Sequence, residues 1–235
     1  MCSIAGIFSA RRAYEAAPSA LSQMARALRH RGPDDSGAWW REEPDAPLLG
    51  LANTRLAILD LSPAGHMPME DAVTGSVLTY NGETFNFPDL RQALEDPANP
   101  WHSHTDTEVV LRAYQQWGAS AWGKLRGMFA LALWDETQKT LTLARDPFGI
   151  KPVYYYQTGD LFVFASEIRA LLASGLVPRR LSRAGRRHFF VFCGFGSFLI
   201  RSSEALAALR TASCASFLAA LSADSTSRVP SRPSE

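Results

Sequence analysis

Cysteine is scarce in this chain, and long apolar runs are missing. Cys2, Cys193 and Cys214 are the only cysteines. Their wide spacing does not fit a zinc site or a redox dithiol, so we expect three free thiols. No stretch approaches the roughly 20 apolar residues of a membrane span, and the first residues lack the basic-then-apolar pattern of a secretory signal. These absences argue against a membrane partner and predict a cytoplasmic protein.

An excess of charge of either sign is also missing. The 24 Lys and Arg nearly balance the 23 Asp and Glu, which argues against a nucleic-acid partner. The histidines at positions 30, 66, 102 and 104 have no metal-ligand spacing, so we expect no metal site. The 235 residues, 46% of them hydrophobic, suffice for one large domain or two small ones with a buried core.

Short apolar runs separated by turn-length gaps are what the chain has instead. Such gaps favour antiparallel strand pairing over strand-helix-strand crossovers. Together with the helices described next, they predict an α+β fold. Strands are expected at 2–9, 56–61, 76–80, 128–134, 140–144, 153–156 and 161–164.

Three helices are predicted between these strands. Leu21, Met24 and Leu28 have helical spacing, and Gly32 with Pro33 is expected to end that helix. The second helix is marked by "HTDTEVVLRAYQQWG", which offers Thr105 and Glu108 as a capping box. The third covers 166–174.

The amino-acid composition and its periodicity change near residue 181. Beyond it the chain is rich in arginine and serine, and the aromatic run "HFFVFCGFGSFLI" has neither helical nor strand-like polarity. We therefore expect one domain over 2–181 and an atypical tail over 182–235. The last residues look disordered, and a shift of reading frame near 182–187 is one explanation.

Cys2 has two readings. Commonly such a residue is a small apolar side chain that opens a buried strand. If Met1 is removed, however, Cys2 carries both a thiol and the free α-amine of the chain, two kinds of group whose ordinary pKa values in model peptides lie near roughly 8.5 and 7.7–8.0. One residue would then supply a nucleophile and its base.

Several ordered segments favour the second reading. They resemble class II glutamine amidotransferases, and most of all the glutaminase half of asparagine synthetase B. The similarity runs from Cys2 to about residue 181. Its segments are "MCSIAGIF", "RHRGPDDSG", "NTRLAILDLSPAGHMPM", "YNGETFNFPDLR", "SHTDTEVVLRAYQQWG", "GMFALALWD", "ARDPFGIKPVYYY" and "FASEIRALL".

The resemblance implies an N-terminal-nucleophile hydrolase fold, a four-layer αββα sandwich of two antiparallel sheets. It also implies that glutamine is hydrolysed to glutamate and ammonia through a cysteinyl thioester on Cys2. Asn81 and Gly82 would form the oxyanion site. On sequence alone, Asn81-Gly82 is a good hairpin turn, and both readings stay open at this point.

Substrate recognition is also implied by the resemblance. Arg55 would bind the α-carboxylate of glutamine, whereas Glu83 and Asp106 would bind its α-ammonium group. As isolated residues, Arg55 would be an exposed strand residue, Glu83 a solvated side chain and Asp106 a carboxylate favoured at a helix N-terminus.

A pocket wall completes the set. By the resemblance, Leu56, Ile58 and Leu59 would form the wall of the glutamine pocket, although on sequence alone the same residues are typical of a core strand. The family's usual "NGEIYN" is "NGETFN" here, so Thr84 and Phe85 depart from the pattern, and we expect this to tune packing more than mechanism.

The synthetase half of the family is absent from this sequence. No Ser-Gly-Gly-x-Asp-Ser pyrophosphate loop occurs, so no cofactor is expected in this chain, and ATP and Mg²⁺ would belong to the missing domain or to a partner chain that accepts the ammonia. A catalytically silent remnant, a glutamine-binding module and another class II amidotransferase remain alternatives.

Overall fold

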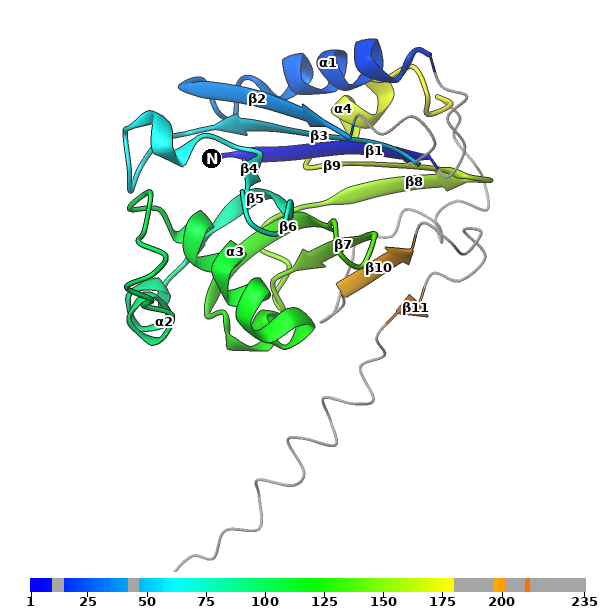
Figure 1. Ribbon diagram of the computed structural model, residues 1–235. Coiled ribbons are helices and arrows are strands. Elements are labelled where there is room, and N and C mark those ends of the chain that lie inside the picture. The colour runs from blue at the N-terminus through cyan, green and yellow to red at the C-terminus, as the bar shows by residue number, and fades with distance from the viewer. Residues whose placement is uncertain (10–14, 42–46, 180–196, 202–209, 212–235) are drawn as a thin grey trace, which may run out of the picture.

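Two antiparallel sheets stack face to face in the computed structural model (Figure 1), which describes residues 1–9, 15–41, 47–179, 197–201 and 210–211. Every strand pair is antiparallel. Sheet A has the order β2-β3-β1-β9-β8 and sheet B the order β11-β10-β7-β6-β5-β4. The strands of sheet A are β1 (Ser3–Ser9), β2 (Asp35–Trp40), β3 (Leu48–Arg55), β8 (Tyr154–Thr158) and β9 (Leu161–Ala165). Those of sheet B are β4 (Met69–Glu70), β5 (Val77–Thr84), β6 (Gly127–Asp135), β7 (Thr140–Arg145), β10 (Ser197–Arg201) and β11 (Arg210–Thr211).

Helices cover the outer face of each sheet (Figure 1). Sheet A carries α1 (Ala17–Leu28) and α4 (Ile168–Ala173), and sheet B carries α3 (Asp106–Trp117), with α2 (Phe87–Ala93) beside it. Short 3₁₀ helices occur at Pro63–Gly65 and Gly118–Lys124. The four-layer αββα arrangement of the prediction is confirmed.

Strand alternation divides the core into three layers. On β1, Ile4 and Phe8 point between the sheets, whereas Ala5 and Ile7 pack beneath α1. On β5, Val77 points between the sheets and Tyr80 packs beneath α3. The odd-numbered residues of β5, Asn81 included, therefore face sheet A.

The expected strand at 56–61 is wrong. The strand β3 ends at Arg55, and the apolar residues that follow lie in a loop, where Ile58 is 73% and Leu61 80% exposed. Hydrogen bonds from Arg55 to the carbonyls of Asp60 and Ser62 hold this loop away from the ladder. The apolar composition of 56–61 therefore predicted a strand where the chain forms a loop, and the strand itself lies just before it.

The predicted helices are found, with two differences in detail. The first, α1, ends at Leu28, before Gly32. Gly32 lies in the loop that follows, where a Cβ would collide with the backbone of Thr54. Thr105 caps α3 by accepting from Glu108 N at 3.3 Å, as expected. The Glu108 carboxylate, however, accepts from the backbone N–H groups of residues 102 and 103 instead of closing the box.

Two short strands come from the segment expected as an atypical tail. The strand β10 pairs with β7 and extends sheet B, and β11 pairs with β10. Most of 182–235, including Cys193 and Cys214, lies outside the described residues, so the boundary at 181 stays a prediction. Cys2 is a free thiol. Among the described residues, no helix is long and apolar enough to cross a membrane.

Candidate active site

Cys2 lies directly before β1, a strand inside sheet A. Its neighbours in the chain, Ser3 and Ile4, pair with Thr54 and Asn53 of β3. The end of β3 is thereby brought to the thiol, and Leu56 N lies 3.4 Å and Leu56 O 3.6 Å from Cys2 Sγ. The Cys2 side chain is half-buried and packs against the core of sheet B beneath α3.

The first two residues are held by Arg31, from the loop after α1. The Met1 amine donates to Arg31 O at 2.9 Å, and Arg31 Nε donates back to Cys2 O at 3.2 Å. Glu167 holds the guanidinium, with Arg31 Nη1 3.0 Å from its Oε1. Burial acts to raise the pKa of Glu167, but hydrogen bonds from Arg31 and His30 outweigh it and leave that pKa lowered.

Sequence reasoning assigned no role to Arg31 or Glu167. Their segments, "RHRGPDDSG" and "FASEIRALL", contribute to the resemblance and to the predicted helix boundaries, but neither residue is among the predicted site residues. The two residues lie 136 positions apart, and only the packing of α4 beside α1 brings them together. No local pattern of spacing could have paired them.

The hairpin-turn reading of Asn81-Gly82 is wrong. The strand β5 runs through both residues to Thr84, and Asn81 pairs with Ala130 and Gly82 with Phe129. Asn81 is 1% exposed on the face toward sheet A, and its Nδ2 has no hydrogen-bond partner in the described part of the chain. A buried donor without a partner is rare and calls for an explanation.

The backbone of Gly82 faces away from β6. Both the N–H and the C=O of its pair partner Phe129 bond to Asp146 on the β7 side, so the Gly82–Phe129 pair is one without mutual hydrogen bonds. Two residues on, Thr84 N faces the same way and donates to Asp106 Oδ2 at 2.8 Å. The Gly82 N–H therefore points to the open edge of β5, beyond the end of β4.

Glycine is required at position 82 by the protein itself. An added Cβ would lie 2.6 Å from Met128 O and 2.7 Å from Phe129 Cβ. The neighbouring strand, more than an approaching substrate, therefore excludes a side chain here.

Arg55 is buried and not an exposed strand residue. It ends β3 and is 6% exposed. Its Nη1 donates to Ser62 O at 3.1 Å, and its Nη2 to Asp60 O. Within the described ranges no carboxylate pairs with this guanidinium, so its charge is met by backbone carbonyls alone.

The loop after Arg55 forms the wall beside the thiol. Leu56 contacts Cys2 through its backbone, whereas Ile58 and Leu59 are largely exposed and do not form the core strand of the alternative reading. Asp60 fixes the loop by accepting from Ser62 N at 2.8 Å and from His104 N at 2.9 Å. These hydrogen bonds, that from His104 first, lower the pKa of Asp60 to about 2.

Asp106 and Glu83 lie at the end of β5. Asp106 begins α3 and is buried, and its Oδ2 accepts from Thr84 N and, at 3.3 Å, from Tyr80 Oη. Burial raises the pKa of Asp106 despite these hydrogen bonds. Glu83 is exposed.

The structure thus divides the predicted site between the two sheets. Sheet A carries Cys2, Arg55 and the loop wall, whereas sheet B carries Asn81, Gly82 and Glu83, with Asp106 bound to the same strand. The sheets meet along the layer that β1 and β3 share with β5. The roles assigned to these residues stay predictions.

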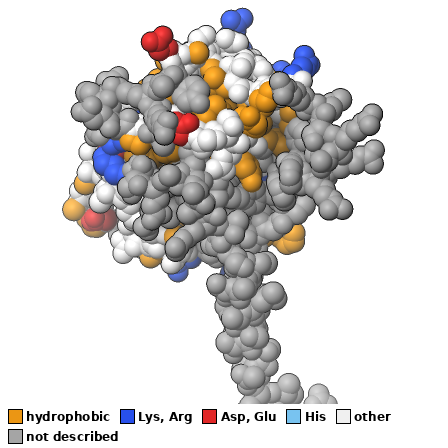
Figure 2. Space-filling model, turned by 90° about the vertical axis from the view of Figure 1, so that its right-hand side faces the viewer, with side chains coloured by type: hydrophobic (Ala, Val, Ile, Leu, Met, Phe, Trp, Pro, Cys, Tyr) orange, Lys and Arg blue, Asp and Glu red, His pale blue; other side chains and the backbone are white. Residues whose placement is uncertain are grey.

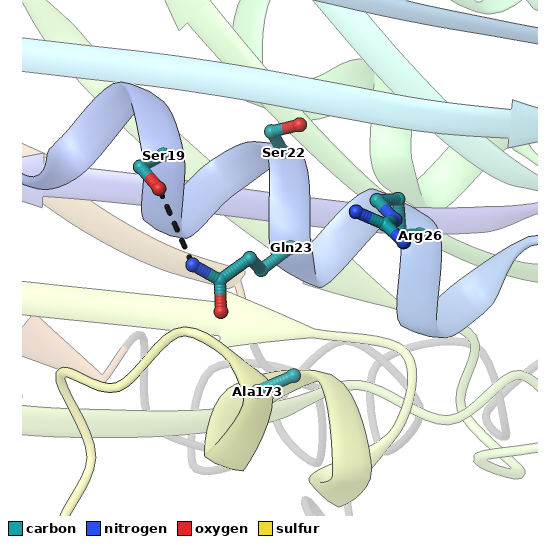
Figure 3. Close-up of a pocket in the computed structure, with 5 residues that line it drawn as sticks. All are labelled: Ser19, Ser22, Gln23, Arg26 and Ala173. Atoms are coloured by element: carbon teal, nitrogen blue, oxygen red, sulfur yellow. Dashed lines mark hydrogen bonds between the residues drawn. The ribbon is translucent and has the colours of Figure 1, made fainter.

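Two hollows lie on the α1 side of sheet A. One, of about 510 Å³, lies between α1 and α4, and Figure 3 shows it with Ser19 bonded to Gln23 on α1 and with Ala173 on α4. The other, of about 600 Å³, lies between α1 and β2. Neither is lined by any of the predicted site residues. Among the described residues on the face in Figure 2, positive and negative side chains are few and scattered among hydrophobic ones.

Comparisons with known proteins identify the family of this chain. A family model described as "Glutamine amidotransferase domain" matches residues 1–215. The chain is 36% identical over 192 residues to asparagine synthetase [glutamine-hydrolyzing] 3 of Bacillus subtilis, covering 81% of this chain and 30% of that protein. It is 37% identical over 159 residues to the amidase chry2 of Gibberella zeae, covering 68% of this chain and 23% of that protein.

A solved structure shares the fold. This is the glutamine phosphoribosylpyrophosphate amidotransferase of B. subtilis, with a TM-score of 0.64 at 20% identity, covering 85% of this chain and 47% of that one. The chain spans about a third or less of the length of the curated relatives it matches here. It belongs to the class II glutamine amidotransferase domain family.

Proposed function

We propose that this domain hydrolyses the side-chain amide of glutamine to glutamate and ammonia. The observation that carries the proposal is the buried, unpartnered Nδ2 of Asn81, next to a Gly82 N–H that faces the open edge of β5. Two donors without obvious protein partners are what a developing oxyanion needs. The family membership of the chain supports the same reaction.

The reaction proceeds in two halves once Met1 has been removed. The Cys2 thiol passes its proton to the α-amine of the same residue, and the sulfur attacks the amide carbon of glutamine. The C–N bond then breaks, and ammonia leaves with the proton from the α-ammonium group. In the second half the α-amine takes a proton from water, hydroxide attacks the thioester, and glutamate and the free thiol are released.

Removal of Met1 is a precondition of this chemistry. Met1 is exposed, and a small second side chain such as that of Cys2 generally permits cleavage. Arg31 already bonds to the carbonyl of Cys2, and we propose that it holds the new N-terminal residue at the end of β1 after cleavage.

Glutamine is recognised as a zwitterion. The Arg55 guanidinium, buried without a carboxylate partner among the described residues, would bind the α-carboxylate, because a buried cation is costly unless a counter-charge arrives. Glu83 and Asp106 would bind the α-ammonium group, and the wall of Leu56, Ile58 and Leu59 would cover the aliphatic part.

The use of the ammonia depends on a second part. We propose that it passes to a synthetase of the asparagine type, in another region or another chain, and that ATP and Mg²⁺ act only there. The domain would work in the cytoplasm, where a free N-terminal thiol stays reduced.

Glutamate release from purified protein tests the proposal. The wild-type chain should release glutamate from glutamine, whereas Cys2→Ala should not, and intact mass should show that the active molecules lack Met1. A wild type no faster than Cys2→Ala would support the silent remnant or the glutamine-binding module. Activity at full rate with Met1 retained would refute the role of the α-amine.

A further inference from the structure

A buried polar link joins the two sheets inside their shared apolar layer. It consists of Asn53 on β3 and Thr79 on β5, which are 1% and 0% exposed. Asn53 Nδ2 donates to Thr79 Oγ1 and to Tyr80 O, each at 3.1 Å, and Thr79 Oγ1 donates to Ala52 O at 3.2 Å. Each sheet thus contributes one side chain and one backbone carbonyl to the link.

The contacts fix the orientation of the Asn53 amide. The carbonyl of Tyr80 can only accept, so the nitrogen of the amide must point toward it. The Thr79 hydroxyl gives its single hydrogen to Ala52 O and must therefore accept from Asn53. Both amide hydrogens of Asn53 are therefore donated in hydrogen bonds, and the amide has one orientation that satisfies them.

Stability alone does not account for this link. Two residues before it on the same faces, its neighbours are apolar, Leu51 on β3 and Val77 on β5. The Asn53 Oδ1 is buried and has no partner among the described residues. A pair of apolar side chains of the same shape would avoid that desolvation cost, so the link costs stability that a fully apolar layer would keep.

What the link does fix is the position of β5 relative to β3. The Tyr80 carbonyl belongs to the same peptide group as the Asn81 N–H, so Asn53 sets the orientation of the peptide that carries Asn81. Two residues beyond Asn53, β3 ends at Arg55, and the next residue contacts the Cys2 sulfur. One polar link therefore lies between the nucleophile side and the oxyanion side of the site.

We propose that Asn53 is a positioning residue, which holds the Asn81 amide and the Gly82 N–H in register with the Cys2 thiol across the two sheets. This rests on the proposed glutaminase function. The side-chain hydrogen bonds of Asn53 go to β5 and not to the thiol, and Asn53 acts through β5. Its loss should lower the rate of the chemical step and leave the binding of glutamine largely unchanged.

A double-mutant cycle on the full chain tests the proposal. We expect Asn53→Leu to lower kcat for glutamine hydrolysis at least tenfold with KM changed less than threefold. In the Asn81→Ala background the same substitution should lower kcat by a clearly smaller factor, because only the Gly82 N–H is left of the two groups that it positions. Thr79→Val should behave like Asn53→Leu, and Thr79→Ser, which keeps the hydroxyl, should restore most of kcat.

Val77→Ala is the matched control. It removes apolar volume from the same strand and the same layer without touching the polar link, so it should lower the melting temperature and change kcat less than twofold. If Asn53→Leu does not fold, the Thr79 pair gives the same comparison.

Two results would overturn the proposal. One is a full multiplicative effect of Asn53→Leu and Asn81→Ala on kcat, and the other is a loss of kcat in Val77→Ala equal to that in Asn53→Leu. In either case a wild type that remains active leaves the glutaminase function standing. A wild type no faster than Cys2→Ala would instead overturn that function and this inference with it.

Discussion

Replacing Asn81 by leucine should make the protein more stable and far less active. The Asn81 Nδ2 is buried without a partner in the described part of the chain, and an unpaired buried donor costs about 1–3 kcal/mol. Leucine has nearly the same shape and no polar atoms. Part of the gain is lost because its branched end must fit a layer packed around an amide, so we expect the free energy of unfolding to rise by about 1 kcal/mol.

The activity should change in the opposite direction. If the Asn81 amide stabilises the oxyanion, its loss raises the barrier by about 2.7–4 kcal/mol, which lowers kcat roughly 100- to 1,000-fold. A site that holds an orphan donor for its transition state gives up folding stability for activity, a common trade-off.

Unfolding in urea and on heating measures the effect on stability, and glutamate release measures the effect on activity, all on one preparation. The six tryptophans report unfolding by fluorescence, and a gain of about 1 kcal/mol corresponds to a rise of about 2–4 °C in Tm for a chain of this size. Asn53→Leu is the matched control, because it removes an equally buried amide whose hydrogens are both bonded, and it should be destabilising. A fall in Tm for Asn81→Leu, or a kcat within tenfold of the wild type, would refute the reasoning.

Three further predictions follow from the same geometry. Gly82→Ala should lower the free energy of unfolding by about 1–3 kcal/mol in urea titration, because its Cβ would collide with Met128 and Phe129. An unchanged midpoint of urea unfolding would contradict this. Arg55→Lys should raise KM for glutamine about 10- to 150-fold with a smaller change in kcat, since lysine lacks the planar fork, and a KM within twofold would argue against carboxylate binding. Asp60→Asn should lower Tm at pH 5 and above but not near pH 2. The lowered pKa of Asp60 stabilises the folded state at pH values above its ordinary pKa of 3.8, and that stabilisation is lost as the pH falls to about 2. A Tm difference between the two proteins that stays constant from pH 5 to pH 2 would count against this.

The strands with long apolar runs could be predicted from the sequence, and the strand that carries Arg55 could not. The runs that became β6 and β9 are continuously apolar and lie inside sheets. By contrast, β3 includes Gly50 and Asn53, two residue types that are depleted in strands, although pairing with β1 and β2 buries it. The strand predicted for the apolar residues just after β3 is wrong, because apolar composition alone does not distinguish a buried strand from an exposed loop.

The local turn signal at Asn81-Gly82 failed for a related reason. Asparagine followed by glycine favours a hairpin turn in isolation, but eight residues of β5 pair with β6 in one unbroken register, and this pairing overrides a two-residue preference. The resemblance depends on ordered motifs along the whole chain, and it assigned Asn81 and Gly82 to the candidate site without needing a turn there. It did not predict the contact of Asn53 with Thr79, which depends on how two sheets stack.

The division of the site between two sheets explains why inter-sheet packing should control its chemistry. A nucleophile on one sheet and oxyanion donors on the other must be aligned to well under an ångström for the donors to act. The hydrophobic effect is not directional, so burial of apolar side chains does not by itself specify one register between the sheets. A directional hydrogen bond from Asn53 to the peptide before Asn81 admits one register. We therefore expect the precision of the proposed site to depend on this polar link in the core.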